Sequence, residues 1–358
     1  MTQSLPSGDP TLELPFAHGG PVLGGRLRAS PEDFVVEEEL GYQASGDGEH
    51  VFLTVRKRER NTHDVARAIA RLAGVPQVAI GYAGLKDRNA VTTQHFSVQL
   101  PGREAPDWSM IEDESLQVID AQRHNRKIRR GSLRGNRFGI RIDSVAGDVA
   151  EAEQRLQRIR DAGVPNYFGS QRFGRGGQNL QRADELLAGR GRRGGREQRS
   201  MLLSAARSQL FNQVLAARVS AGNWDRAIDG DVMSLEGSQR QFMYEPADPS
   251  IADRLAQLDI HPTGPLCGRV RRALQPDADA KLNEERALAD AQPWIAGLTR
   301  LGLDADRRAF RLVVSGLAWQ WQGDALLLSF HLVAGAFATA VLREIVCSPD
   351  ADETDPDS

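Results

Sequence analysis

The order in which strand-like and helix-like patterns follow one another is the feature that most constrains the fold of this chain. In the first 145 residues, apolar residues alternate with polar ones over short stretches. This alternation predicts strands at Phe34–Leu40, His50–Arg56, Gln77–Ala83, His95–Leu100, Gln117–Ala121 and Phe138–Ile142. Only Thr62–Leu72 has helical spacing, with Thr62 as its expected N-cap. Few helices among many strands favour an α+β domain with a mostly antiparallel sheet.

From about Val149 the pattern becomes helical. The spacing of apolar residues predicts helices at Val149–Ala162, Ser200–Ala221 and Asp279–Leu301. Strand-like spacing returns at Arg311–Ser315 and Ala325–His331, followed by a helix at Phe337–Val346. The order of strand-like, helical and again strand-like patterns predicts one sheet domain that is interrupted by an inserted, helix-rich domain.

Length and cysteine content restrict the class of protein. A chain of 358 residues can bury a substantial core without disulfides, and its two cysteines, Cys267 and Cys347, lie far apart without metal-ligand spacing. The N-terminal residues do not form a signal peptide, and no window approaches about 18 consecutive apolar residues. We therefore expect a cytoplasmic protein without a membrane-spanning segment or a zinc site.

The charge distribution points to an anionic partner although the formal net charge is −3. The run RHNRKIRRGSLRGNR, Arg123–Arg137, contains seven basic residues and no acid, and strand-like segments flank it. We interpret it as a surface that contacts phosphates. The Gly-rich run Arg190–Arg199 is interpreted as a solvated surface loop, and the acidic tail from Ser348 to Ser358 as disordered.

One charged loop between two predicted strands is a candidate catalytic site. In GYAGLKDRNAVTTQHFSV, Asp87 follows a strand and the turn-forming Gly84, and Lys86 and Arg88 flank it. Loops at strand ends often hold catalytic groups, and the two bases favour an ionised carboxylate. The alternative, a turn with a capping Asp and two solvated bases, is left open by these residues alone.

Two further stretches have the composition of a nucleic-acid site. VPNYFGSQRFGRGGQNL, Val164–Leu180, interleaves aromatic rings with arginines and amides, which suits unstacked bases and phosphates but equally suits core packing. In GNRFGI, Asn136 and Phe138 are two apart, so on a strand they share a face and offer an amide beside a ring.

Several common classes of enzyme lack their motifs here. Histidines such as His63, His95 and His124 show no HxH, HxxxH or HExxH spacing, and each is read as structural or surface. The chain also has no GxxxxGK[ST], no GxGxxG after a strand and no GxSxG. The enzyme classes that remain are those that act on an anionic substrate without a cofactor.

Taken together and in order, the motifs resemble those of the tRNA pseudouridine synthase D (TruD) family over nearly the whole chain. The matching segments are SPEDFVVEE at Ser30–Glu38, GLKDRNAVTTQ at Gly84–Gln94, GNRF at Gly135–Phe138, VPNYFGSQRFGRGGQNL at Val164–Leu180, SAARSQLFNQ at Ser204–Gln213, GPLCG at Gly264–Gly268 and AGAFATAVLREI at Ala334–Ile345. Each segment alone is weak evidence, but their combined order is specific.

The resemblance implies a fold and a site. The fold is a mostly antiparallel pseudouridine synthase domain at 1–162 and 311–346, an inserted helix-rich α/β domain at 163–310, and the tail 347–358. The catalytic nucleophile of the family falls on Asp87. Its substrate-contacting positions fall on Phe34, Asn136 and Phe337, and Phe138 stands where many other pseudouridine synthases place a tyrosine against the target base.

The implied reaction isomerises a uridine in tRNA, at position 13 in this family, to pseudouridine. It needs no redox or energy input, so we expect no cofactor and no metal, and tRNA as the partner with no protein partner implied. We expect Lys86 and Arg88 to orient the carboxylate or hold the adjacent phosphate. Weaker phosphate contacts are expected from Arg126, Lys127, Arg129 and Arg130.

Two other functions remain possible on the residues. A glycosidase or base-excising hydrolase would also use Asp87 as nucleophile, but it normally pairs that residue with a second carboxylic acid, which the motif around Asp87 does not offer. The other possibility is an RNA-binding or chaperone module that performs no catalysis.

Overall fold

The computed structural model describes residues 9–190 and 194–347, which form two compact units. We call the first the sheet unit, which comprises Leu23–Gly147 and Ser315–Gly335 together with Cys347. We call the second the helical unit, which comprises the segment up to Val22, Asp148–Val314 and Ala336–Val346.

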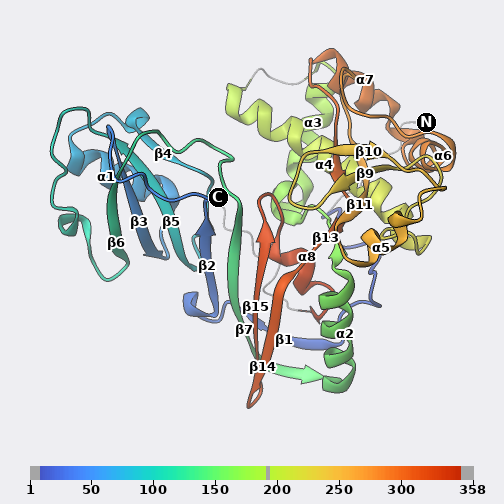
Figure 1. Cartoon of the computed structure of the whole chain (residues 1–358), viewed down its shortest axis with the longest axis horizontal. Helices are drawn as coiled ribbons and strands as arrows, with labels where there is room; N and C mark the ends of the chain where they lie inside the picture. The colour runs from blue at the N-terminus through green and yellow to red at the C-terminus, as the bar shows by residue number, and fades with distance from the viewer. Residues whose placement is uncertain (1–8, 191–193, 348–358) are drawn as a thin grey trace. The chain divides into compact units, whose positions relative to one another are not determined.

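The sheet unit contains one long sheet in the order β14-β15-β7-β2-β5-β3-β6, with β1 paired to β7 and β4 paired to β5 (Figure 1). Its strands are β1 (Leu23–Leu27), β2 (Phe34–Glu39), β3 (His50–Arg58), β4 (Ile80–Tyr82), β5 (Val91–Gln99), β6 (Leu116–His124), β7 (Gly135–Gly147), β14 (Ser315–Gln322) and β15 (Ala325–Val333). These pairings are antiparallel except that of β2 with β5, which is parallel. The expectation of a mostly antiparallel sheet is therefore confirmed.

The register decides which side chains share a face at the centre of this sheet. On β7, Phe138 lies opposite Val36 of β2 and Phe330 of β15, and Asn136 lies opposite Glu38. Residues directly opposite each other in a ladder point to the same face. The prediction that Asn136 and Phe138 share a face is thus confirmed, and Glu38 and Phe330 join them.

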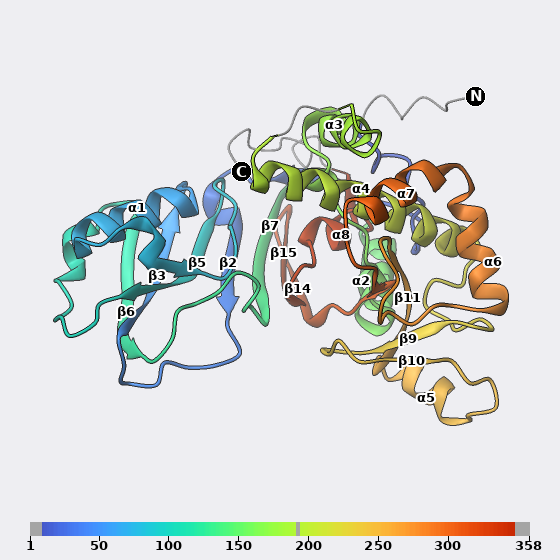
Figure 2. The same cartoon turned by 90° about the horizontal axis from the view of Figure 1, so that it is seen from above.

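Helix α1 (Thr62–Ala73) covers the β3–β5 part of the sheet (Figure 2). Its buried Val65 and Ile69 pack with Leu53, Val55 and Phe96 in one apolar cluster. Burying a side chain of this size contributes about 1.5–3 kcal/mol, so the cluster fixes α1 on the sheet. The β2, β7 and β15 part of the same sheet carries aromatic residues instead.

The strands predicted in the sheet unit all exist, with shifted ends. The prediction at His95–Leu100 covers only the second half of β5, and that at Gln77–Ala83 contains a 3-10 turn before β4. The N-cap prediction was wrong by one residue: Asn61 caps α1. The Thr62 hydroxyl instead donates to Gln94 Oε1 at 3.0 Å and accepts from the Lys86 N–H at 3.1 Å.

The helical unit mixes helices with short strands. Its elements are α2 (Val149–Ala162), β8 (Val164–Pro165), α3 (Gln178–Leu187), α4 (Arg196–Ser220), β9 (Val232–Leu235), β10 (Gln241–Met243), α5 (Ser250–Ala256), β11 (Ile260–Leu266), α6 (Ala278–Ala287), α7 (Gln292–Arg300), β12 (Asp306–Ala309), β13 (Arg311–Leu312) and α8 (Ala338–Leu342). The strands form the sheets β10-β9-β11-β12 and β13-β8. A short strand, β16 (Val346–Cys347), ends the described chain.

The core of the helical unit surrounds α4, which lies beside α3 (Figure 2). Phe211 of α4 is fully buried there with Phe173 and Phe310. Helix α2 has the predicted bounds, with the Asp148 side chain accepting from the Glu151 N–H at 3.0 Å as its N-cap. The single helix predicted at Asp279–Leu301 is wrong: α6 and α7 are separate, and Pro293 in the first turn of α7 cannot continue a preceding helix.

Two other predicted segments differ in extent. The last helix is shorter than Phe337–Val346, because Phe337 is its N-cap and α8 ends at Leu342, after which the Glu344 and Ile345 N–H groups make tighter turn bonds to the carbonyl oxygens three residues before. Part of the basic run Arg190–Arg199 is the start of α4 rather than a loop, and 191–193 lie outside the described residues.

The mixed α+β class is confirmed, whereas the domain boundaries stay a prediction. The division between the two units falls at Gly147/Asp148 and Val314/Ser315, so it places α2 in the helical unit. The predicted boundaries were 162/163 and 310/311. The predicted acidic tail at 348–358 lies outside the described residues.

Candidate active site

Asp87 lies in the loop that joins β4 to β5. Its carboxylate forms an ion pair with Arg28, with Nη2 of the arginine 2.9 Å from Oδ2 of the acid. The Asp87 side chain is 33% exposed and that of Arg28 is 20% exposed, so water and solutes reach the pair. A carboxylate in this setting can act as a base or a nucleophile.

Arg28 follows directly after β1 and has a backbone φ of +58°, in the left-handed region. A non-glycine residue in this region costs on the order of 1 kcal/mol or more, and surrounding contacts must hold it. One of these contacts is with Phe34: the Arg28 guanidinium lies 4.2 Å from the centre of the Phe34 ring. Arg28 thus connects the Asp87 carboxylate to an aromatic cluster.

The aromatic cluster is formed by Phe34, Phe138 and Phe330 on neighbouring strands. Phe34 meets Phe138 edge to face at 6.2 Å, and Phe138 stacks with Phe330 at 5.3 Å. All three residues are buried, with Phe138 7% exposed. Such pairs contribute about 0.5–1.5 kcal/mol beyond their buried area, which holds in place the ring that Arg28 contacts.

Lys86, the residue before Asp87, has a different carboxylate partner. Its Nζ lies 2.9 Å from Oε1 of Glu38, and Oε2 of Glu38 accepts from the His95 N–H at 2.8 Å. The Glu38 side chain is fully buried and that of Lys86 is 6% exposed. Burial raises the pKa of Glu38, but the hydrogen bonds from His95 and the charge of Lys86 outweigh burial and lower it. Glu38 is therefore ionised, and its ion pair with Lys86 anchors the loop to the sheet.

The loop backbone is held at further points. Lys57 on β3 donates from Nζ to the Asp87 carbonyl oxygen at 3.0 Å and to the Arg60 carbonyl oxygen at 2.6 Å. Gln94 Nε2 donates to the Gly84 carbonyl oxygen at 2.6 Å. Burial lowers the pKa of Lys57 to about 8, against the attraction of Asp87. These side-chain bonds replace the ladder bonds that a loop lacks.

Asn136 presents an unsatisfied acceptor on the same face of the sheet. Its Oδ1 is buried and has no hydrogen-bond partner among the described residues. The preceding Gly135 is required for a close approach of strands, because a Cβ there would lie 2.2 Å from His331 Nε2 and 2.5 Å from the Leu332 carbonyl oxygen. A buried acceptor without a donor costs about 1–3 kcal/mol, which a bound donor can offset.

The basic segment between β6 and β7 is stacked on tyrosines. The Arg126 guanidinium lies 5.0 Å from the centre of the Tyr42 ring, and that of Arg130 lies 4.3 Å from Tyr82. Arg130 also donates to the Tyr82 hydroxyl at 2.8 Å, and the Lys127 ammonium donates to the Val78 carbonyl oxygen. The Gly131 N–H donates to the Ala83 carbonyl oxygen at 2.8 Å, which ties this segment to the Asp87 loop.

The predicted site residues thus divide between the two units. Asp87, Lys86, Phe34, Asn136 and Phe138 come together in the sheet unit. Phe337 belongs to the helical unit, where it lies 6.3 Å from Phe168. Arg88 is exposed, and within residues 9–190 and 194–347 its side chain has no ion pair.

Sequence reasoning missed Arg28, Glu38 and Lys57. It expected Lys86 or Arg88 to orient the Asp87 carboxylate, but the ion pair is made by Arg28. Glu38 had a readable signal, since strand alternation from the buried Phe34 and Val36 puts it on the inward face. For Arg28 no signal exists in the sequence, because its pairing depends on the loop 59 residues further along the chain.

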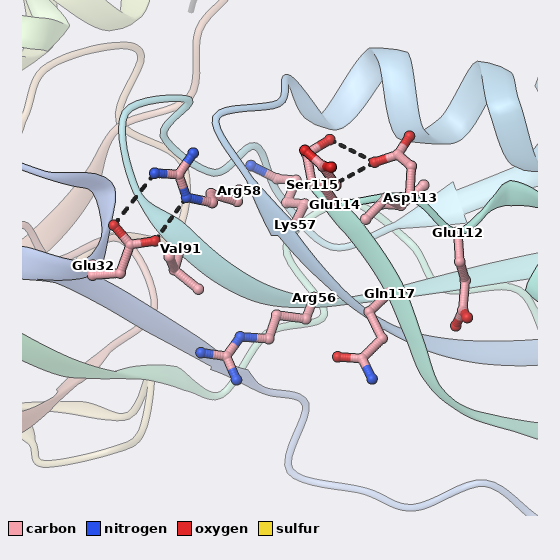
Figure 3. A pocket seen from close by; sticks show the side chains of 11 residues that line it. Glu32, Arg56, Lys57, Arg58, Val91, Glu112, Asp113, Glu114, Ser115 and Gln117 are labelled. Carbon is pink, nitrogen blue, oxygen red and sulfur yellow. Dashed lines mark hydrogen bonds and ion pairs between the residues drawn. The ribbon is translucent and has the colours of Figure 1, made fainter.

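A hollow in the sheet unit, with a volume of about 400 Å³, lies at the ends of β3 and β6 and shares Lys57 with the contacts of the Asp87 loop (Figure 3). Its lining mixes four acids with three bases, and Glu32 and Arg58 in it pair with each other. None of the predicted site residues lines this hollow. The excess of carboxylates makes it a poor site for a phosphate.

Two features of residues 9–190 and 194–347 bear on other classes of function. No group of three or more His, Cys, Asp and Glu side chains is placed to hold a metal ion. No helix in this part of the chain is long and apolar enough to cross a bilayer.

The comparisons with known proteins agree with one another. The family model for tRNA pseudouridine synthase D (TruD) matches residues 14–189 and 195–345. The chain is 49% identical to the tRNA pseudouridine synthase D of Xanthomonas campestris, covering 96% of this chain and 97% of that protein. It is 50% identical to the protein of the same name from Methylococcus capsulatus, covering 93% and 94%.

A solved structure shows the same fold. It is the crystal structure of a protein from Methanosarcina mazei described as a candidate tRNA pseudouridine synthase D. It superimposes with a TM-score of 0.70 at 21% identity and covers 93% of this chain and 98% of that one. With the family model and the close relatives, this places the chain in the tRNA pseudouridine synthase D family, a family of isomerases.

Proposed function

We propose that this protein isomerises a uridine of tRNA, at position 13, to pseudouridine, with Asp87 as the nucleophile and without a cofactor. The observation that carries the assignment to Asp87 is its accessible carboxylate, held by Arg28 against Phe34 on a loop that buried bonds keep in place. The reaction breaks the N1–C1′ bond and forms a C5–C1′ bond, and C5 loses a proton while N1 gains one. No electrons are exchanged with another molecule, so no redox partner is required.

The carboxylate has three possible tasks in this reaction. It attacks C1′, adds to the uracil ring, or removes the C2′ proton to give a glycal. Each needs an ionised acid fixed beside the sugar, because correct placement of reacting groups contributes several kcal/mol to lowering a barrier. Arg28 supports all three, since an arginine fixes the direction of a carboxylate through its planar donors.

The uracil ring is proposed to lie against the aromatic cluster. A flipped base costs a few kcal/mol to unstack, and contact with an aromatic ring returns about 1–3 kcal/mol. Phe34 and Phe138 form this contact, with Phe138 offering the small part of its ring that is exposed. The unsatisfied Oδ1 of Asn136 accepts the N3–H of uracil, the one strong donor of that ring.

The remaining predicted residues have supporting roles in this proposal. The catalytic domain is 1–162 and 311–346, the inserted domain is 163–310, and Phe337 supplies a further contact to the substrate. Lys86 and Arg88 lie next to the nucleophile, and Arg88 meets the adjacent phosphate. Residues 126, 127, 129 and 130 contact phosphates elsewhere on the tRNA.

The test replaces Asp87 by Asn and measures pseudouridine in tRNA from cells that carry either variant as their only copy. The wild type is expected to form pseudouridine at one site, and Asp87→Asn to form none, while both bind tRNA. Asp64→Asn is the matched control, since Asp64 is an exposed acid on α1 of the same unit and pairs with Arg67. Pseudouridine formed by Asp87→Asn would refute the assignment. Release of free uracil by the wild type would favour a hydrolase, and binding without any product a binding module.

A further inference from the structure

The helical unit holds a pair of cations around one aromatic ring. The guanidinium of Arg308 lies 4.2 Å from the centre of the Phe168 ring, and that of Arg172 lies 5.5 Å from the same centre. Arg172 also lies 5.8 Å from the centre of the Phe337 ring. Two arginines of like charge therefore share a small aromatic surface that ends at a partly exposed phenylalanine.

The electrostatics of this pair are unusual for a folded protein. Burial lowers the pKa of Arg172, and burial together with the charge of Arg172 lowers the pKa of Arg308 to about 9. Within residues 9–190 and 194–347, no carboxylate lies within ion-pair distance of Arg172, and its Nε has no hydrogen-bond partner. Its one side-chain bond is from Nη1 to Ser204 Oγ at 3.2 Å. A like charge nearby disfavours the charged form of a guanidinium, and an anion beside Arg172 favours it.

Other buried arginines of the helical unit show what structural packing looks like. Arg218 lies 5.3 Å from the Phe310 ring and pairs with Asp231 through two contacts of 3.0 Å. Arg307 pairs with Glu284. In both cases the chain provides the acid, as expected for a buried charge. Arg172 differs from them because the described chain provides none.

The surroundings hold this arrangement in place before any ligand arrives. The Asn212 side chain accepts from the Phe168 N–H and donates to the Phe168 carbonyl oxygen, both at 2.9 Å. Arg308 donates to Asn166 Oδ1, and Asn166 Nδ2 donates to the Ala309 carbonyl oxygen at 3.0 Å. A site that is fixed in advance loses less entropy on binding.

We propose that Arg172, with Arg308 adding positive charge, binds a backbone phosphate of the RNA substrate, and that Phe337 contacts the nucleoside attached to that phosphate. A guanidinium suits this ligand because its planar donors match two phosphate oxygens. This inference rests on the proposed function, since it takes RNA as the substrate. It also gives a role to the segment VPNYFGSQRF, whose rings Tyr167, Phe168 and Phe173 are buried and whose arginine has no acidic partner among the described residues.

The experiment measures tRNA binding against salt concentration for Arg172→Gln, Arg172→Lys and a control, all made in the Asp87→Asn background. Loss of one phosphate contact is expected to weaken binding about 10-fold at low salt and to reduce the slope of log K against log[salt] by about 0.7–0.9. Arg172→Lys keeps the charge and is expected to keep the slope. Thermal melting of each variant checks that it is folded.

The matched control is Arg254→Gln. Arg254 also lies on an aromatic ring of the helical unit, 5.6 Å from Phe242, but it pairs with Asp259 at 2.6 Å. It is expected to leave both affinity and slope unchanged. An unchanged slope in Arg172→Gln, or an equal loss in Arg254→Gln, would overturn the inference.

Two further measurements separate the possible failures. If inorganic phosphate raises the melting temperature of the wild type but not of Arg172→Gln, and tRNA binding is equal in both, the site belongs to a free anion and the RNA assignment fails. Pseudouridine formation by the otherwise wild-type enzyme tests the proposed function alone. An active wild type with an unchanged Arg172→Gln slope would refute only the phosphate site.

Discussion

Two carboxylate–cation pairs meet at consecutive residues of the Asp87 loop, and they differ in one property. The Lys86–Glu38 and Arg28–Asp87 pairs both have a nitrogen–oxygen distance of 2.9 Å. Glu38 is fully buried, whereas Asp87 is 33% exposed. Where water is excluded, the ion pair fixes the loop; where water enters, it leaves the proposed nucleophile exposed. Access to water, and not the chemistry of the pair, separates the two.

The largest effect is expected from exchanging acid for amide in each pair. Glu38→Gln leaves the Lys86 ammonium buried without its partner, which should lower the free energy of unfolding by about 3–5 kcal/mol. Asp87→Asn, the same change in the accessible pair, should alter it by less than about 1 kcal/mol while abolishing activity. Urea denaturation of both variants measures the difference. Equal stability losses would show that burial does not distinguish the pairs.

The pH dependence of stability tests a third buried contact of the loop. Lys57 is buried like Lys86, but it donates to the Asp87 carbonyl oxygen. Its pKa is about 8 in the folded chain against an ordinary 10.5, so the folded state binds this proton less tightly. Below pH 8 the amine is charged in both states and the burial cost is constant. Between about pH 8 and 10.5 that cost is relieved, and the wild type should gain on the order of 3 kcal/mol relative to Lys57→Met.

This gain is measured by urea denaturation of both proteins at pH 7 and pH 10. Subtracting the variant removes the contributions of tyrosines and cysteines that titrate in the same range. A difference that does not change with pH would mean that Lys57 keeps its ordinary pKa.

Replacing Arg28 tests the accessible Arg28–Asp87 pair through its cation. Arg28→Met removes the group that directs the Asp87 carboxylate, and a misplaced catalytic group commonly costs about 10²-fold in rate. The effect should fall on kcat more than on KM, with stability changed by less than about 1 kcal/mol. Arg28→Lys should recover part of the rate. If Arg28→Met affects only KM, the arginine binds substrate rather than orienting Asp87.

The smallest effect concerns the basic segment, which lies outside both pairs. Arg130→Gln should weaken tRNA binding by a few fold and reduce the salt slope by about 1, with kcat unchanged. Filter binding between low and moderate salt measures the slope. Arg67→Gln on α1 is a suitable control, since Arg67 is exposed in the same unit and pairs with Asp64.

Much of the sheet unit could be predicted from the sequence, because alternation over several residues reports a strand with one buried face. The loop carrying Asp87 was located for the same reason, as charge and glycine interrupting two such strands. Of the short strands of the helical unit, β13 lies in the strand predicted at Arg311–Ser315, whereas β9 to β12 were missed. β11 contains Pro262 and Pro265, and β12 contains two adjacent arginines, so neither shows alternation.

The parts of the site that could not be predicted depend on contacts between distant segments. Arg28 adopts a left-handed backbone that its own residue type disfavours, and its partner is in another loop. Residue type alone also cannot tell a core ring from a binding ring. Tyr167, Phe168 and Phe173 are buried in the core of the helical unit, as one of the two interpretations of their segment held.

The pairing of β15 with β7 has a consequence for the synthesis of the protein. β15 is made after the whole segment Asp148–Val314, yet its Phe330 stacks on Phe138 of β7. β7 therefore leaves the ribosome long before β15 does, and the edge of β7 that pairs with β15 stays unpaired in the meantime. Contacts so distant in sequence form slowly. We expect the segment Asp148–Val314 to fold before β15 pairs with β7, and a chaperone that shields β7 to raise the yield of active enzyme.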